Sequence, residues 1–252
     1  MKKPAAVVAA VNLHAVLRNL EDLCKLDAKA RDIIAGKKVS VRFLLPGSDN
    51  LVLRFQGEES AAVRNSSSAD MDLRFLSPAH FNSMIEGSGA PIPTKGFGHI
   101  SFLKSEFTKL AELLTKYLRP GKEDLADEGF RTRSTILTAY TAFFALAEIG
   151  NMDPVGKVCA GGIEDGSIQI DVPGVVSIVI EAKGGKLSAR KGSDPKAKAF
   201  MIFDDIETAG GILRGTLDSY ECIGKGKLRI KGRIAMIDNL NRLLGLVSRY
   251  LG

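Results

Sequence analysis

The side chains that could bind a metal or begin nucleophilic catalysis are few and scattered in this chain of 252 residues. Its three histidines, His14, His80 and His99, form no i, i+4 pair, and no cysteine lies at ligand spacing from them. A zinc site needs at least three such side chains in one place, so we predict no metal site. We expect His80 to be a partly exposed surface residue.

The three cysteines, Cys24, Cys159 and Cys222, are odd in number and far apart. This spacing argues against a disulfide framework and is typical of a reducing compartment, so we expect a cytoplasmic protein. We expect Cys159 and Cys222 to be buried as small hydrophobic side chains.

Motifs for catalysis or cofactor binding are also missing. Residues 224–227 read Gly-Lys-Gly-Lys, which lacks the glycine spacing and the final Ser or Thr of a phosphate loop, and neither GxGxxG nor GxSxG occurs. No nucleophile–base pair can be named. We therefore predict a protein that is not an enzyme and has no cofactor.

Basic residues gather in two runs. Residues 183–198 hold six basic side chains against Asp194 alone, and residues 225–233 hold a second basic run. Strand alternation should place Lys227, Arg229 and Lys231 on one face. That face is either an ordinary solvated sheet surface or a platform for an anionic membrane or another acidic partner. Near a membrane each basic residue contributes roughly 1 kcal/mol. We expect no nucleic-acid partner because no aromatic residues lie between the basic ones.

The sequence repeats itself once, at an offset of 126 to 128 residues. Residues 20–23 match 146–149, residues 46–47 match 173–174, and residues 84–87 match 212–215. Such a period is too long for a solenoid repeat of roughly 20–50 residues. We predict two copies of one domain, residues 1–122 and 123–252, with the border in the Pro-Gly and charged stretch 119–124.

Within each half the patterns predict a helix followed by alternating strands. Residues 39–43 and 51–55 alternate in the first half, as do residues 168–172 in the second. Ser77-Pro78 and Asp204 or Asp205 are expected to begin a short helix, and a leucine-rich helix closes each half. We expect α+β architecture with two similar domains, each a roughly five-stranded sheet covered on one face by helices. Residues 200–203 are apolar throughout, so we expect that strand to be covered on both faces.

Two apolar stretches imitate membrane signals. Residues 2–11 look like a signal peptide, but the segment that follows them matches residues 142–146 in mid-chain, so we expect a first helix. The apolar run 136–149 is shorter than the roughly 20 residues that cross a bilayer. We expect it to be a buried helix.

This order of elements resembles the sterol carrier protein type-2 domain. The resemblance rests on residues 165–170, the glycines and Leu187 of 184–187, residues 199–203 and 209–215, and the Gly-Lys-Leu-Arg-Ile-Lys-Gly run 226–232. The first half matches more loosely, because the proline-interrupted stretch 89–94 stands there and no clean equivalent of the strand 228–232 follows. Members of that family bind sterols, fatty acyl chains or other apolar molecules in a tunnel between sheet and helices, or serve as accessory domains.

The resemblance implies non-enzymatic binding or transfer of an apolar ligand, such as a lipid, fatty acyl chain, sterol or isoprenoid. The expected lining lies in the second half and consists of Met201, Phe203, Ile212, Leu213, Met236, Leu240, Leu243 and Val247. Methionine suits such a lining because its flexible thioether adapts to different shapes. The alternative is a protein–protein interaction or scaffold module with filled cores, accessory to an enzyme complex. The oligomeric state stays open.

Overall fold

The computed structural model describes residues 3–251 of the chain. By its internal contacts the chain divides into two compact units, with the border after Asp124 rather than after residue 122. A turn of 3-10 helix, η5 (Asp124–Ala126), lies across this border. Each unit is described by itself below.

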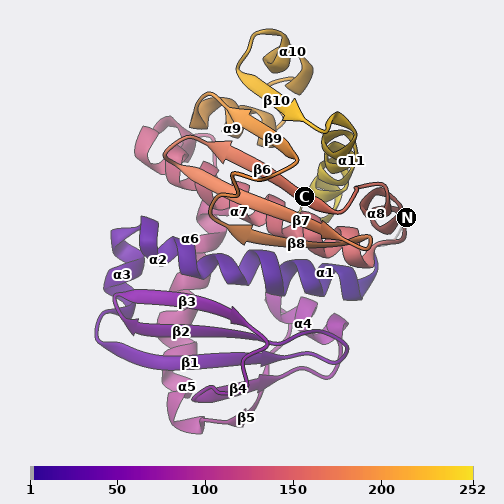
Figure 1. The fold of residues 1–252 in the computed structure, drawn as a ribbon. Coiled ribbons are helices and arrows are strands. Elements are labelled where there is room, and N and C mark those ends of the chain that lie inside the picture. Colours follow the sequence, from indigo (N-terminus) through magenta and orange to yellow (C-terminus); the bar gives the residue numbers. More distant parts are fainter. Residues whose placement is uncertain (1–2, 252) are drawn as a thin grey trace. The chain divides into compact units, whose positions relative to one another are not determined.

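Unit 1 contains one five-stranded sheet (Figure 1). In the sequence, its helices come before the first strand, between the fourth and fifth strands, and after the fifth strand. Its strands are β1 (Lys37–Leu44), β2 (Leu51–Gly57), β3 (Glu59–Arg64), β4 (Met71–Arg74) and β5 (Ile92–Lys95). Its helical segments are α1 (Ala5–Val11), η1 (Asn12–Val16), η2 (Leu17–Asn19), α2 (Leu20–Leu26), α3 (Ala28–Ile34), α4 (Pro78–Ile85), η3 (Phe97–His99), α5 (Ile100–Phe102), η4 (Leu103–Phe107) and α6 (Thr108–Leu118). Within these, η1 and η4 have π-helical hydrogen bonding.

Unit 2 follows the same order of elements with one addition. Its strands are β6 (Gly166–Val172), β7 (Val176–Lys183), β8 (Lys186–Lys191), β9 (Ala199–Phe203) and β10 (Leu228–Gly232). Its helices are α7 (Glu128–Met152), α8 (Pro154–Gly161), α9 (Ile206–Leu213), α10 (Ser219–Gly224) and α11 (Ile234–Leu251). The addition is α10, because unit 1 has no helix between α4 and its fifth strand.

The two sheets have one strand order. In unit 1 the order is β3-β2-β1-β4-β5, and in unit 2 it is β8-β7-β6-β9-β10. In both, the first strand pairs antiparallel with the second and parallel with the fourth, and the fifth strand lies antiparallel at the edge. The expected α+β fold class, with a five-stranded sheet and covering helices in each unit, is confirmed.

Alternation along the strands places the core on one face of each sheet. Val39, Val41 and Phe43 of β1 are buried, and the ring of Phe43 lies 6.0 Å from that of Phe107 in the helical layer. In unit 2 the buried apolar residues of β6 and β7 are mostly isoleucines and valines, and α7 packs against β7 and β8 (Figure 1). Residues 136–149 of α7 are buried almost throughout. Among the described residues, no helix has the length and apolarity that a membrane crossing requires.

The helix ends follow the expected chemistry. The Ser77 hydroxyl accepts a hydrogen bond from the His80 backbone N–H at 3.1 Å, with Pro78 in the first helical turn. Of the two candidate caps for α9, Asp205 is the one that accepts, from the Thr208 N–H at 2.7 Å. These bonds satisfy backbone donors that have no partner inside the helix.

One expectation about strands is wrong, and another agrees with the structure. The counterpart of β10 in unit 1 is β5, which is not a clean equivalent: it contains Pro93 and has an irregular register beside Asp72 and Leu73. An edge strand tolerates proline because one side of its backbone is unpaired. In β9, Met201 and Phe203 are buried, but Phe200 and Ile202 are only half-buried. The second face of β9 is therefore not fully covered.

Candidate functional site

The expected lining residues come together in part. Six of the eight are buried, and they lie on two elements that contact each other, β9 and α11: Met201, Phe203, Met236, Leu240, Leu243 and Val247. Ile212 and Leu213, at the end of α9, are only half-buried. The structure thus forms one apolar layer between β9 and α11. Their assignment to a ligand stays a prediction.

The spacing of apolar residues along α11 explains this layer. Its buried side chains recur three or four residues apart, which places them on one stripe of the helix facing the sheet. Ile237 and Tyr250 belong to the same buried stripe and were missed by sequence reasoning. The same periodicity contains both residues, so the signal that could have found them was present.

A buried hydrogen bond fixes the far end of α11. The Tyr250 hydroxyl donates to Asp153 Oδ2 at 2.6 Å, and Asp153 Oδ1 accepts from the N–H groups of Val155 and Gly156 at the start of α8. Burial alone would raise the pKa of Asp153, but these hydrogen bonds outweigh burial and hold the pKa below its usual range. Burial and the bond to Asp153 raise the pKa of Tyr250 to about 12.

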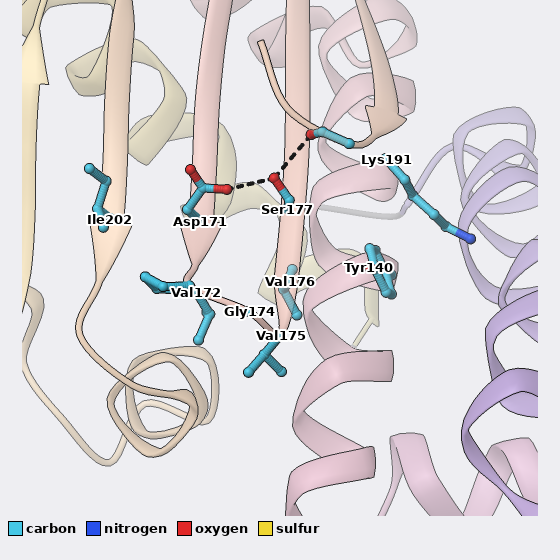
Figure 2. A pocket seen from close by; sticks show the side chains of 11 residues that line it. Tyr140, Asp171, Val172, Gly174, Val175, Val176, Ser177, Lys191 and Ile202 are labelled. Carbon is cyan, nitrogen blue, oxygen red and sulfur yellow. Dashed lines mark hydrogen bonds between the residues drawn. The ribbon is translucent and has the colours of Figure 1, made fainter. Parts of the chain in front are cut away.

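A surface hollow of about 570 Å³ lies at the β6–β7 hairpin of unit 2 (Figure 2). Its walls come from the hairpin, from α7, from the end of β8 and from β9: Tyr140, Asp171, Val172, Pro173, Gly174, Val175, Val176, Ser177, Lys191, Gly192 and Ile202. None of the eight expected lining residues contributes to it. The hollow and the apolar layer are therefore two separate candidate sites.

The polar groups of the hollow are engaged in holding the fold. The Ser177 hydroxyl donates to Asp171 Oδ1 at 2.6 Å and to the Gly192 carbonyl at 3.1 Å (Figure 2). The Gln169 side-chain amide also donates to Asp171, while its oxygen accepts from the Asp194 N–H at 2.7 Å. This network ties the hairpin to the β8–β9 connection. No histidine is among the residues that line the hollow.

Lys191 gives the hollow its one cation. Its ammonium lies 5.1 Å from the centre of the Tyr140 ring, a cation–π distance. Arg190, the preceding residue, points to the other face of the strand and pairs with Glu181 at 2.8 Å. Within the basic run 183–198, Arg190 and Lys191 therefore lie on opposite faces of β8, and Arg190 is paired. On β10, by contrast, Arg229 and Lys231 are both exposed on the same face.

Other reactive groups do not assemble into a site in residues 3–251. No cluster of three or more His, Cys, Asp or Glu side chains in that range could hold a metal ion. Cys24, Cys159 and Cys222 are free thiols and buried. His80 is half-buried, and its ring bonds the Leu76 N–H and the Ala90 carbonyl on either side of α4.

Comparison with known proteins gives structural likeness only. No family model matches the chain, and no curated protein sequence matches it. A solved ubiquinone-synthesis protein described as UbiJ-SCP2 is 17% identical over 44% of this chain and 96% of its own, with a TM-score of 0.35. The sterol carrier protein domain 2 of Helicoverpa armigera is 19% identical over 44% of this chain and 89% of its own, with a TM-score of 0.36.

A sterol carrier protein 2-like protein of Aedes aegypti is 16% identical over 41% of this chain and 94% of its own, with a TM-score of 0.28. Each likeness covers less than half of the chain. The fold described above rests on this chain's own strands and helices, and the family stays a resemblance.

Proposed function

We propose that this protein binds an apolar ligand, such as a lipid, fatty acyl chain, sterol or isoprenoid, without transforming it. The site is the layer between β9 and α11 in unit 2. The ligand enters between the sheet and the helices and replaces contacts that these side chains now make with each other. The protein would then either hold this apolar ligand or transfer it from one binding partner to another.

The observation that carries this proposal is the composition of the layer. All six buried members are hydrocarbon or thioether side chains, and two of them, Met201 and Met236, are methionines on facing elements. Methionine has three rotatable bonds and no branch, so it can move aside for a guest at low cost. The half-buried Ile212 and Leu213 at the end of α9 extend the apolar surface toward solvent.

The energetics of such a site are sufficient. Each methylene that leaves water contributes roughly 0.8 kcal/mol. Half of a long acyl chain therefore offsets the cost of association, and micromolar affinity corresponds to about −8 kcal/mol. No charged group of the ligand needs a partner for this binding.

Native mass spectrometry of the full chain, purified without detergent, tests the proposal. We expect a co-purifying mass of a few hundred daltons that is released by organic solvent. We also expect a fluorescent fatty acid to bind the delipidated protein with micromolar affinity. Protein that carries no such mass and ignores fatty acids and sterols would contradict the proposal.

The rival function is a scaffold or protein-interaction module, and one observation favours it. The six buried residues of the layer are each 5% exposed or less, so protein atoms already surround them. In the rival function the core stays filled and close-packed and binds no guest. In that case the mass spectrum shows apo-protein only, and the fatty-acid titration is flat.

A further inference from the structure

The segment around the added helix of unit 2 exposes apolar side chains to solvent. Three of them lie on and just before α10 at intervals of three residues: Leu217 is 40% exposed, Tyr220 is 77% exposed and Ile223 is 37% exposed. The helix buries only Cys222. Tyr220 and Ile223 are three residues apart on α10 and share a helix face, and Leu217 lies two residues before the helix. We call these three side chains the apolar ridge.

Unit 1 shows that the sheet closes without this ridge. The offset between matched residues is 128 at Gly87 and Gly215 but 136 at Gly96 and Gly232. The residues added between these points contain α10. In unit 1, residues 86–91 connect α4 to β5 with no helix at all. The ridge is therefore an addition to the domain rather than a part of its core.

Cations lie directly after the ridge in the chain. β10 contacts α10, and Arg229 and Lys231 stand exposed on one face of it. Neither makes an ion pair with any residue in the described range 3–251. Their neighbours Lys225 and Arg233 are paired, with Glu221 and Glu164 respectively. Figure 1 shows α10 beyond β10, at the end of the unit.

We propose that the α10–β10 surface (Leu217, Tyr220, Ile223, Arg229 and Lys231) docks on an anionic membrane surface. The three apolar side chains insert at the level of the headgroups and upper acyl chains, where a tyrosine ring with its polar tip is favoured. The two unpaired cations stay at the phosphate level on their flexible apolar stems. This surface goes beyond the proposed ligand binding and does not depend on it.

An apolar ridge followed by cations matches a bilayer better than it matches nucleic acid. Nucleic-acid surfaces supply no hydrocarbon for the ridge, and the ridge's one aromatic ring is a sparse stacking platform. A bilayer supplies hydrocarbon and negative charge in adjacent layers. The chemistry of the surface is therefore complementary to anionic lipid.

The chain contains no tryptophan, so a single introduced indole reports on one place. In the full-length Tyr220→Trp variant we expect the emission to shift to shorter wavelength with vesicles of phosphatidylcholine and phosphatidylserine, and brominated lipid to quench it. The matched Leu76→Trp variant places the indole at another strongly exposed apolar position, in unit 1, and should not respond. A Tyr220→Trp emission that the anionic vesicles leave unchanged would overturn the proposal.

Vesicle flotation measures the two parts of the surface separately. We expect Arg229→Gln/Lys231→Gln to weaken binding to the anionic vesicles on the order of ten- to thirty-fold, and Leu217→Ser/Tyr220→Ser/Ile223→Ser to weaken it at least as much. The control Lys29→Gln/Lys104→Gln removes the same charge from exposed positions of unit 1 and should bind like the parent. The proposal is wrong if the parent binds neutral and anionic vesicles equally. It is also wrong if the parent binds neither kind of vesicle, which is the result expected if this surface binds an acidic protein instead.

Discussion

In each unit a tyrosine hydroxyl donates a hydrogen bond to a buried aspartate. Tyr117 donates to Asp27 at 2.5 Å in unit 1, and Tyr250 donates to Asp153 at 2.6 Å in unit 2. Each aspartate also caps the helix that follows it, α3 or α8. The bond therefore joins the last helix of a unit to the turn after its first helical stretch, 90 or 97 residues away.

Removing one of these hydroxyls should destabilise its unit. We expect Tyr250→Phe to lower the free energy of unfolding by about 1.5–3 kcal/mol, because the buried Asp153 carboxylate loses a charge-assisted hydrogen bond. Urea denaturation at pH 7 measures this loss. Tyr220→Phe removes the same hydroxyl from an exposed site and should change stability by less than about 0.5 kcal/mol. Equal effects of the two substitutions would show that the Asp153 bond contributes little.

A buried histidine makes unit 1 sensitive to acid. His14 is 3% exposed, and its Nε2 lies 3.4 Å from the Ser48 hydroxyl. Burial, followed by the positive charge of Arg64, lowers its pKa from 6.5 to about 4, and Arg18 acts in the same direction while Asp49 opposes it. The folded state thus holds His14 neutral at pH values where the unfolded chain protonates it.

The sign of the pH effect follows from this lowered pKa. Between pH 6.5 and about 4 the unfolded chain binds the extra proton, so stability is intact above pH 6.5 and falls with decreasing pH. The loss should reach on the order of 3 kcal/mol near pH 4. Unfolding free energies measured from pH 7.5 to 4.5 test this. His14→Gln should flatten the slope relative to the parent, and a parallel slope for His14→Gln would contradict the assignment.

At the scale of elements, a glycine with left-handed backbone stands at the end of the fifth strand in each sheet. Gly96 has φ +76° and Gly232 has φ +82°. A Cβ atom would lie 2.3 Å from the Asp70 carbonyl oxygen at the first position and 2.1 Å from the Lys198 carbonyl oxygen at the second. In each unit the contacted carbonyl belongs to the residue just before the fourth strand. The close approach allows the chain to leave the sheet beside that strand.

Alanine at either glycine should be poorly tolerated. We expect Gly232→Ala and Gly96→Ala each to cost at least about 2 kcal/mol, because the left-handed backbone and the clash with a carbonyl oxygen act together. Gly245→Ala is the matched control: it lies in α11 with open space around it, and should stabilise the protein by about 0.5–1 kcal/mol. Thermal or urea unfolding of the three variants decides. A near-neutral Gly232→Ala would show that the strand end can shift.

At the scale of the molecule, the two units share a strand order but not an edge. The fifth strand of unit 1 is four residues long with an irregular register, and that of unit 2 is five residues long and regular. We infer that unit 2 is the better ligand binder, because its β9–β10 pair supplies a continuous wall beside the apolar layer. This wall is a second reason, beside the composition of the apolar layer, to place the ligand in unit 2.

Matched substitutions in the two units test this assignment. We expect Met201→Trp and Leu243→Glu to abolish fluorescent fatty-acid binding, by filling the layer or by placing a desolvated carboxylate in it. Leu73→Trp and Leu110→Glu, at buried positions of unit 1, should leave most of the binding in place. Circular dichroism checks the fold of each variant. Folded unit 2 variants that bind like the parent, with unit 1 variants that do not, would assign the ligand to unit 1.

Local patterns in the sequence were sufficient for the architecture. Strand alternation and helix caps predict the elements of each unit, because they depend on residues close together in the chain. The repeat at 126 to 128 residues predicts that the two α+β units have one strand order. The same periodicity identified Met201, Phe203 and the α11 residues as an inward-facing set. Ile212 and Leu213 are only half-buried, because a short helix end can be apolar without being covered, and their place in a ligand site stays a prediction.

Only the tertiary structure decided which distant groups meet. In the repeat, Asp153 corresponds to Asp27 and Tyr250 to Tyr117. The hydrogen bond between Asp153 and Tyr250 nevertheless depends on the packing of α11 against the turn before α8. Likewise the burial of His14, the division of the basic run at Arg190 and Lys191, and the exposure of α10 depend on neighbours far away in the chain. Burial and partner choice are properties of the folded surroundings, and residue type and local spacing do not contain them.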